Sequence, residues 1–275
     1  MQPPRFIAPF LGIIILAVSC RSFEPFTFVH MSDTQIGFLD ESPSYAYSDS
    51  LMKAAVDGAN AIGPDFVFIT GDLVNDPADP VQDSIYKVRL AEINAPVYVV
   101  PGNHDYLGFT REKQQAYITR RGYDRFSFQA KGCAFIGIDS NCIIDGAQEA
   151  ESEQWEWLEK ELAAARNCRY TFVFLHSPVI RESVDEPEDY FNFPTEKRRQ
   201  YIDLFKRYGV DAVLAGHCHQ EFSCTIDGIL FTVAGSVGHA LGHGVPCYNV
   251  VKVSSDGITI SSEFLAENNA GEGKE

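Results

Sequence analysis

The chain has 275 residues, of which 45% are hydrophobic and 22% are charged, values that suit one large folded domain and exclude a disordered or fibrous protein. Its formal net charge is −16 at pH 7, and no basic stripe interrupts the acidic surface that this charge predicts. Such a surface repels nucleic-acid backbones, so we expect no nucleic-acid partner, although a metal-lined pocket can still draw in one phosphate.

The first 20 residues have the pattern of an export signal. Arg5 is the only charge before the apolar run Phe6 to Val18, which is too short to span a bilayer but has the length of a signal-peptide hydrophobic region. Residues 16–20 read LAVSC and resemble a bacterial lipobox, in which Cys20 would be lipidated, although Ala17 stands where that pattern more often has Leu. The alternative is an ordinary secretory signal with an incidental cysteine.

Either signal predicts an exported protein, which is a membrane-anchored lipoprotein or is periplasmic. We expect residues 1–19 to be removed, residues 20–25 to form a short tether, residues 26–265 to form one domain and residues 266–275 to form a polar tail. Removal of residues 1–19 deletes one Arg and no acid, which changes the net charge from −16 to −17. A lipidated Cys20 would hold the domain close to a membrane surface.

Export also permits disulfides among the other cysteines. Six cysteines allow 15 pairings, and the sequence does not choose among them. They have no Cys-x-x-Cys spacing, and they are equally well explained as small buried apolar residues. They are Cys133, Cys142, Cys168, Cys218, Cys224 and Cys247.

Strand and helix alternate from Phe26 to about Ala215. Runs rich in β-branched and aromatic residues predict strands at 26–30, 66–70, 97–100, 171–175 and 212–215. Helical patterns cover 48–62, 80–93, 111–121, 152–165 and 195–208. Ser152 and Thr195 are predicted N-caps, and Gly63 and Gly209 are predicted helix ends.

Only strands are predicted after Ala215. Residues 222–226 and 229–234 flank Asp227-Gly228, and residues 248–253 and 258–264 flank Asp256-Gly257, so both pairs predict hairpins. The whole pattern predicts an α/β (α+β) fold with two mixed β-sheets packed face to face and helices outside.

Five short polar blocks each follow a predicted strand. Because the carboxyl ends of strands in an open α/β sheet build a common site, we expect the blocks to converge. Carboxylate, amide and imidazole groups at this edge are ligands for two divalent metal ions. The blocks are Asp33-Thr34-Gln35, Gly71-Asp72 with Asn75, Gly102-Asn103-His104-Asp105, His176, and Gly216-His217-Cys218-His219.

The charge of this ligand set favours phosphate chemistry. Asp33 and Asp72 supply two negative charges and the other donors are neutral, so two dications keep about +2 before a hydroxide binds and about +1 afterwards. That residual charge suits a phosphate anion. In the blocks that begin with Gly102 and Gly216, glycine before a ligand permits the sharp turn that ends the strand.

The blocks closely resemble those of the calcineurin-like metallophosphoesterase superfamily, and the resemblance covers the chain from Phe26 to about Phe264. It implies two divalent ions, which would be Mn, Mg, Zn or Fe. It also implies that His104 lies beside the substrate as general acid and that Asp105 orients His104. The implied metal ligands are Asp33, Gln35 and His219 at the first ion, Asp72 as a bridge, and Asn103, His176 and His217 at the second ion.

Two residues depart from the usual family pattern. Gln35 stands where a second imidazole is usual, and its amide oxygen is a harder and weaker ligand for Zn²⁺ or Fe²⁺, which predicts weaker occupancy of the first site or a preference for Mn²⁺ or Mg²⁺. The segment Asp33 to Gly37 resembles a subgroup that carries Gln here and includes protein serine/threonine phosphatases. Asn75 stands where purple acid phosphatases need a Tyr, which argues against a coloured iron enzyme.

Other residues around the blocks have two interpretations each. His239 and His243 lie in the loop 235–244 and either touch substrate or face solvent. Arg181 binds an anion or forms a salt bridge. His30 is predicted to be buried and Cys218 to point away from the metals. The expected pocket rims are loops 40–47 and 177–194, which carry the aromatic residues Tyr45, Tyr47, Tyr190, Phe191 and Phe193.

We therefore predict an exported phosphatase that hydrolyses phosphomonoesters by attack of a metal-bound hydroxide, with His104 as acid. Its substrate would be a phosphorylated small molecule or a phosphoprotein. One alternative is a phosphodiesterase or nucleotidase of the same superfamily. An alternative of another class is a non-catalytic metal-binding module of the same fold.

Overall fold

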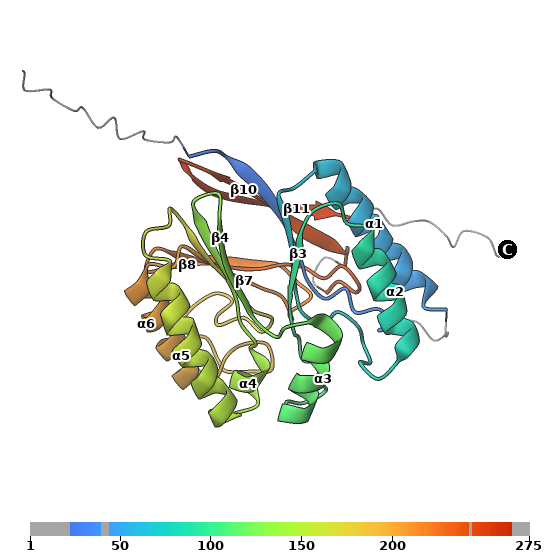
Figure 1. Cartoon of the computed structure of the whole chain (residues 1–275), viewed down its shortest axis with the longest axis horizontal. Coiled ribbons are helices and arrows are strands. Elements are labelled where there is room, and N and C mark those ends of the chain that lie inside the picture. The colour runs from blue at the N-terminus through green and yellow to red at the C-terminus, as the bar shows by residue number, and fades with distance from the viewer. Residues whose placement is uncertain (1–22, 40–43, 242–243, 266–275) are drawn as a thin grey trace, which may run out of the picture.

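Two β-sheets pack face to face with helices outside them, as predicted (Figure 1). The computed structural model of the chain describes residues 23–39, 44–241 and 244–265. The signal segment, Cys20, His243 and the polar tail lie outside the described residues. None of the helices in these ranges is both long enough and apolar enough to cross a bilayer.

The first sheet has the strand order β11-β10-β1-β2-β3. Its middle strands β1, β2 and β3 are parallel, with Val29 opposite Val67 and Ile69 opposite Val99, and β10 runs antiparallel to β1. Parallel strands end at the same edge, so the segments after β1, β2 and β3 meet there. The bounds are β1 Phe26–Met31, β2 Phe66–Thr70, β3 Val97–Val100, β10 Cys247–Ser254 and β11 Gly257–Phe264.

The second sheet has the order β4-β5-β6-β7-β9-β8, in which β5, β6, β7 and β9 are parallel. Both Asp-Gly hairpins are confirmed, as β8 pairs with β9 and β10 with β11. The hairpin of β4 and β5 was not predicted. Its turn is Lys131-Gly132, both at positive φ, and lysine there lacks the Asn-Gly or Asp-Gly signal. The bounds are β4 Phe126–Ala130, β5 Cys133–Gly137, β6 Thr171–Phe174, β7 Ala212–Ala215, β8 Phe222–Ile226 and β9 Ile229–Val233.

Five helices agree with the predicted ranges to within four residues, and the short helix α4 was not predicted. Gly63 and Gly209 end α1 and α6 in left-handed conformation, as predicted. Both predicted N-caps are wrong, because α5 begins before Ser152 and Thr195 is itself the first residue of α6. The bounds are α1 Ala46–Ile62, α2 Pro80–Ala91, α3 Arg111–Arg121, α4 Asn141–Ile144, α5 Gln148–Ala164 and α6 Thr195–Tyr208.

A layer of phenylalanines fills the space between the sheets. Phe68 and Phe174, from opposite sheets, stack with ring centroids 4.0 Å apart, and Phe28 meets Phe172 edge to face at 5.3 Å. Such rings interdigitate with few alternative packings, so the layer fixes one sheet relative to the other. The strand ends of both sheets are thereby held in a fixed arrangement.

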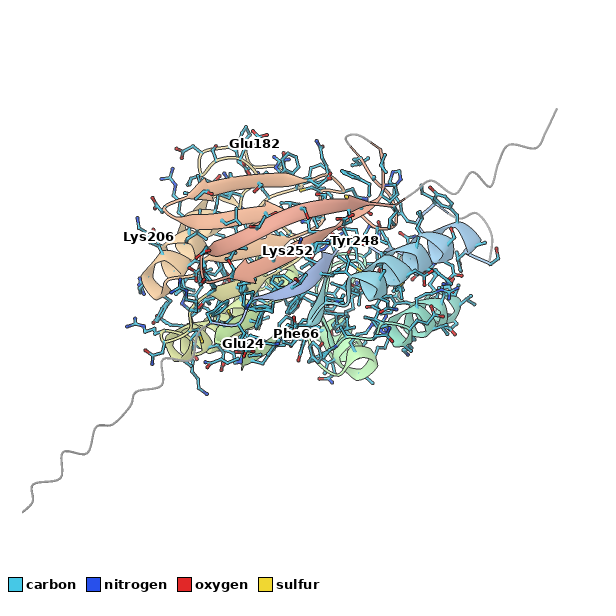
Figure 2. The ribbon with its side chains drawn as sticks, turned by 90° about the horizontal axis from the view of Figure 1, so that it is seen from above. Glu24, Phe66, Glu182, Lys206, Tyr248 and Lys252 are labelled. Carbon is cyan, nitrogen blue, oxygen red and sulfur yellow. The ribbon has the colours of Figure 1, made fainter. Side chains whose placement is uncertain are left out.

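Helices cover the outer faces of both sheets. In Figure 1, α1 and α2 lie on one side of the molecule and α5 and α6 on the other. Tyr248 is at the end of β10 near α1 (Figure 2), and a Cβ atom on Gly58 would be 2.4 Å from its hydroxyl, so the helix approaches the sheet closely at its glycine. Within the described ranges the six cysteines form no disulfide, and Cys133, Cys142, Cys218 and Cys247 are buried.

Candidate metal centre

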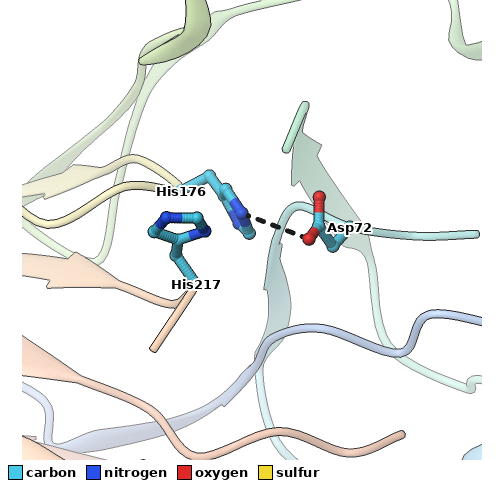
Figure 3. A group of neighbouring side chains, drawn as sticks. All are labelled: Asp72, His176 and His217. Atoms are coloured by element: carbon cyan, nitrogen blue, oxygen red, sulfur yellow. Dashed lines mark ion pairs between the residues drawn. The ribbon is translucent and has the colours of Figure 1, made fainter. Parts of the chain in front are cut away.

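The polar blocks converge where the strands of both sheets end. Ligand atoms of Asp33, Asp72 and His219 all lie within 4.8 Å of one another, as do those of Asp72, His176 and His217. Figure 3 shows the second group, in which Nε2 of His176 is 3.4 Å from Oδ2 of Asp72. Asp72 belongs to both groups, so its carboxylate lies between two adjacent cation sites.

The histidines of the two groups are each oriented by a main-chain carbonyl. A carbonyl oxygen only accepts, so the ring nitrogen facing it carries the proton and the other ring nitrogen presents a lone pair. This is the arrangement in which imidazole binds a metal ion. The donating pairs are His176 Nδ1 to Thr70 at 2.7 Å, His217 Nε2 to Tyr190 at 2.9 Å and His219 Nδ1 to His239 at 2.5 Å.

Two oxygen atoms of the first block are buried and make no hydrogen bond to the described residues. They are Oε1 of Gln35 and Oδ1 of Asp33, and the latter lies 3.3 Å from Nε2 of His219, the ring nitrogen that presents a lone pair. Burial of an unpaired carboxylate or amide oxygen is costly, and a cation is the usual compensation. Oδ1 of Asn103 lies 3.0 Å from Nε2 of His176 and adds a further oxygen to the second group. The donor set therefore fits two divalent cations.

The carboxylates draw positive charge into this cluster. Burial lowers the pKa of His176, but Asp72 and Asp33 outweigh burial and raise it to about 9. Burial and the charge of His176 lower the pKa of His217 to about 4. Burial opposes ionisation of Asp33, but His219 and His176 hold its pKa well below the ordinary value. The carboxylates of the cluster thus stabilise positive charge placed between them, and divalent ions carry such charge.

Several residues of the cluster have a left-handed backbone, which side chains other than glycine seldom adopt. The φ angles are 52° for Asp33, 50° for Asp72, 71° for His217 and 53° for His219, and Gln35 is at 40°. Each such residue costs roughly 1–2 kcal/mol of backbone strain. Strain concentrated at one end of the sheets marks this end as the functional part of the fold.

Three glycines bring the blocks together, and they do so in two ways. Gly71 has φ of 87° and makes a sharp turn, a role that we had predicted for Gly102 and Gly216. Gly102 and Gly216 do not need positive φ; they are needed for space. A Cβ atom on Gly102 would be 2.2 Å from Oδ1 of Asp72, and one on Gly216 would be 1.6 Å from Oγ of Ser32. The turn explanation is therefore wrong for these two.

His104 lies beside the cluster, but its partner differs from the predicted one. Nδ1 of His104 is 3.2 Å from the carbonyl oxygen of Asn75, whereas the Asp105 carboxylate accepts from the backbone N–H groups of Gly102 and Leu73. Asp105 therefore supports the loops around Asp72 and does not orient His104. Burial and the charge of Asp72 raise the pKa of Asp105 to about 6.

The remaining histidines and Cys218 divide as follows. His30 is buried, with Nε2 2.9 Å from Oγ1 of Thr70, as predicted. Cys218 packs in the core under α5 and α6 and belongs to neither ligand group, also as predicted. His239 lines the pocket, with its ring 5.5 Å from that of Phe38.

A pocket of about 200 Å³ opens over the cluster. Tyr190 and Phe191 line it as predicted, whereas Phe193 is buried in the core and Tyr45 donates to Asp79. Phe38 and Leu241 line it without having been predicted, although Phe38 directly follows the first block. The described lining residues are Gln35, Phe38, Asp72, His104, Tyr190, Phe191, His217, His219, His239 and Leu241.

The chain belongs to the calcineurin-like phosphoesterase family, which it matches over residues 26–221. It is therefore a metallophosphoesterase, a hydrolase of phosphoric esters that uses two divalent metal ions. The serine/threonine-protein phosphatase CPPED1 of Danio rerio is 31% identical over 257 residues, which span 85% of this chain and 83% of that protein. CPPED1 of Rattus norvegicus is 28% identical over 257 residues, which span 85% of this chain and 82% of that protein.

A solved dimetal phosphatase from Danio rerio has the same fold. The two structures superpose with a TM-score of 0.68 at 16% sequence identity, over 88% of this chain and 97% of the other. The resemblance of the motif blocks to this superfamily and the predicted fold are thereby confirmed.

Proposed function

We propose that this chain is a phosphatase that hydrolyses phosphomonoesters at the pocket over the two ligand groups. The observation that carries the proposal is the sharing of Asp72 by both groups, with His104 beside them. Asp33, Gln35 and His219 would hold one ion, and Asn103, His176 and His217 the other. Two divalent ions held there would supply a nucleophile at neutral pH and neutralise charge on the phosphoryl oxygens.

His104 is suited to protonate the leaving group. Its backbone N–H donates to Oδ1 of Asp72 at 2.8 Å, and the Asn75 carbonyl accepts the Nδ1 proton, so in the imidazolium form of His104 the proton on Nε2 is the transferable one. As the bond from phosphorus to the ester oxygen breaks, this proton passes to that oxygen and an alcohol leaves. Proton transfer from a positioned side chain contributes about 10²–10⁴-fold to such reactions.

The pocket favours an uncharged alcohol portion in the substrate. Its described lining includes neither Lys nor Arg, and three of its walls are the rings of Phe38, Tyr190 and Phe191. Arg181 is paired with Asp189 at 2.7 Å, as the salt-bridge interpretation expected. These features support a phosphoprotein side chain or a small neutral phosphomonoester as substrate. The serine/threonine-protein phosphatase relatives favour the phosphoprotein.

One assay separates monoesterase from diesterase. Metal-free protein is reconstituted with Mn²⁺, Mg²⁺, Zn²⁺ or Fe²⁺ and given an aryl phosphate monoester and the matching diester. We expect faster hydrolysis of the monoester. Faster hydrolysis of the diester would support the phosphodiesterase alternative, and no hydrolysis with any metal would support the non-catalytic module.

His104→Ala tests the acid role through the leaving group. An alkyl alcohol needs a proton when it leaves, whereas 4-nitrophenolate leaves readily without one. We expect the variant to lose about 10²–10⁴-fold in kcat on a phosphoserine peptide and much less on 4-nitrophenyl phosphate. Metal content is measured as the control and should not change. Equal losses on both substrates would show that His104 does not donate the proton.

We further propose that the protein is exported and anchored through a lipidated Cys20. The pattern of residues 1–20 supports export, and Phe23 already packs edge to face on Tyr170 at 5.9 Å, so the tether would be short. Because β1 starts at Phe26 and Asp33 follows its other end, the pocket would face away from the anchor.

Cell fractionation tests the anchor. Cys20→Ser should move the protein from the membrane fraction to the soluble fraction without changing kcat. Recovery of the unaltered protein in the soluble fraction would contradict the anchor and leave a periplasmic protein.

A further inference from the structure

Tyr190 reaches the second ligand group from a loop that contains none of the motif blocks. Its hydroxyl accepts a hydrogen bond from Nδ2 of Asn103 at 3.2 Å, and its carbonyl accepts one from Nε2 of His217 at 2.9 Å. Its ring centroid is 4.8 Å from that of His217. One residue of the loop 177–194 thus contacts two of the three histidine and amide ligands proposed for the second ion.

The hydroxyl of Tyr190 selects one of the two orientations of the Asn103 amide. Only the amide oxygen can bind a cation, because the NH₂ group has no lone pair available. With Nδ2 directed to Tyr190, Oδ1 faces Nε2 of His176 at 3.0 Å, inside the second group. The opposite orientation would place the NH₂ group at the ion.

The carbonyl of Tyr190 sets the tautomer of His217. Because this oxygen only accepts, the proton of neutral His217 resides on Nε2, and Nδ1 is left as the coordinating atom. A substitution of the side chain of Tyr190 leaves this main-chain contact in place, which allows the two contacts to be separated.

The loop holds Tyr190 in a fixed position. Arg198 is fully buried and donates to the carbonyls of Val184, Glu186 and Phe193. The Glu186 carboxylate accepts from the backbone N–H groups of residues 181–183 and from Nδ2 of Asn192. These bonds tie both ends of the loop to its interior, so the hydroxyl of Tyr190 is presented by a preorganised segment.

We propose that Tyr190 is a positioning residue for the second metal ion, and that its hydroxyl raises the affinity of that site by orienting Asn103. The proposal rests on the ligand assignment in the proposed function. The first site should be insensitive to the hydroxyl, because no contact joins Tyr190 to Asp33, Gln35 or His219 among the described hydrogen bonds.

Tyr190→Phe keeps the ring and the main-chain carbonyl and removes only the hydroxyl. We expect Mn²⁺ to bind about tenfold more weakly at the site of Asn103, His176 and His217, and as strongly as before at the other site. Tenfold is the lower end of the loss in metal affinity when a group that holds a metal ligand is removed. Titration calorimetry gives both constants. The electron paramagnetic resonance signal of the coupled Mn²⁺ pair should need correspondingly more Mn²⁺ to develop.

The matched control is Tyr170→Phe, which removes a hydroxyl bonded to the Ser254 carbonyl at 3.1 Å, at the opposite end of β6 from His176. It should change neither constant. At saturating Mn²⁺, kcat of Tyr190→Phe should return to nearly the parent value.

Three results would overturn the inference. They are unchanged binding constants in Tyr190→Phe, equal weakening of both sites, and a kcat that stays low at saturating Mn²⁺, which would mean that the hydroxyl contacts substrate. Failure of the proposed function is recognised separately. If the parent protein binds two Mn²⁺ but hydrolyses no phosphate ester, the binding constants of the parent and of Tyr190→Phe can still be compared.

Discussion

Asp72→Asn is expected to abolish most hydrolysis of phosphate esters at limiting metal. Asp72 is the residue common to both ligand groups, so the loss of its charge weakens two ions at once. If each ion loses about 10–100-fold in affinity, activity at limiting metal falls by roughly 10²–10⁴-fold. Activity measured across a Mn²⁺ titration, with metal content per chain, checks this expectation.

Stability gives a second readout for Asp72→Asn. Metal that binds only the folded state raises the melting temperature, and the rise should largely disappear in the variant. The control is Asp57→Asn, which makes the same chemical change at an exposed ion pair with Lys53 on α1 and should leave activity intact. Two tightly bound Mn²⁺ in Asp72→Asn would contradict the bridging role.

Gly102→Ala is expected to damage both the fold and the site. The new methyl group would be 2.3 Å from the backbone nitrogen of Asp72 and 2.2 Å from its Oδ1, so the strand ends must separate. We expect the free energy of unfolding to fall by about 3 kcal/mol. A displacement of Asp72 of about 1 Å should lower hydrolysis by about 100-fold.

The comparison variant is Gly122→Ala, where a Cβ atom meets open space but φ is 94°. Its cost should be about 1–2 kcal/mol of backbone strain, with no effect on metal content. Denaturant unfolding and metal analysis compare the two variants. Equal losses of stability, with full metal content in both, would show that space at Gly102 is not limiting.

The order of strands, helices and polar blocks made the fold predictable, because parallel strands bring distant segments to one edge. Asp33, Asp72 and His176 were placed together in this way. Details inside a loop were not predictable. Whether Asp105 or the Asn75 carbonyl meets His104 depends on backbone angles that residue types do not determine.

Contacts from outside the motif blocks were also beyond the sequence. Tyr190 was recognisable only as an aromatic residue near the site, and Phe38 was not predicted at all, since a loop has no periodicity from which a side-chain direction follows. The spatial role of Gly102 and Gly216 was missed for a related reason: the close neighbour of each glycine comes from a different strand end.

The four imidazoles of the site share a feature with consequences for how the enzyme tolerates change. His104, His176, His217 and His219 each direct one ring nitrogen at a main-chain oxygen, and among the described hydrogen bonds no carboxylate side chain accepts from that nitrogen. Every residue type has a main-chain carbonyl oxygen, so replacement of the neighbouring side chains leaves the rings aligned. Evolutionary drift can therefore reshape the pocket wall for new esters while the four rings keep their orientation.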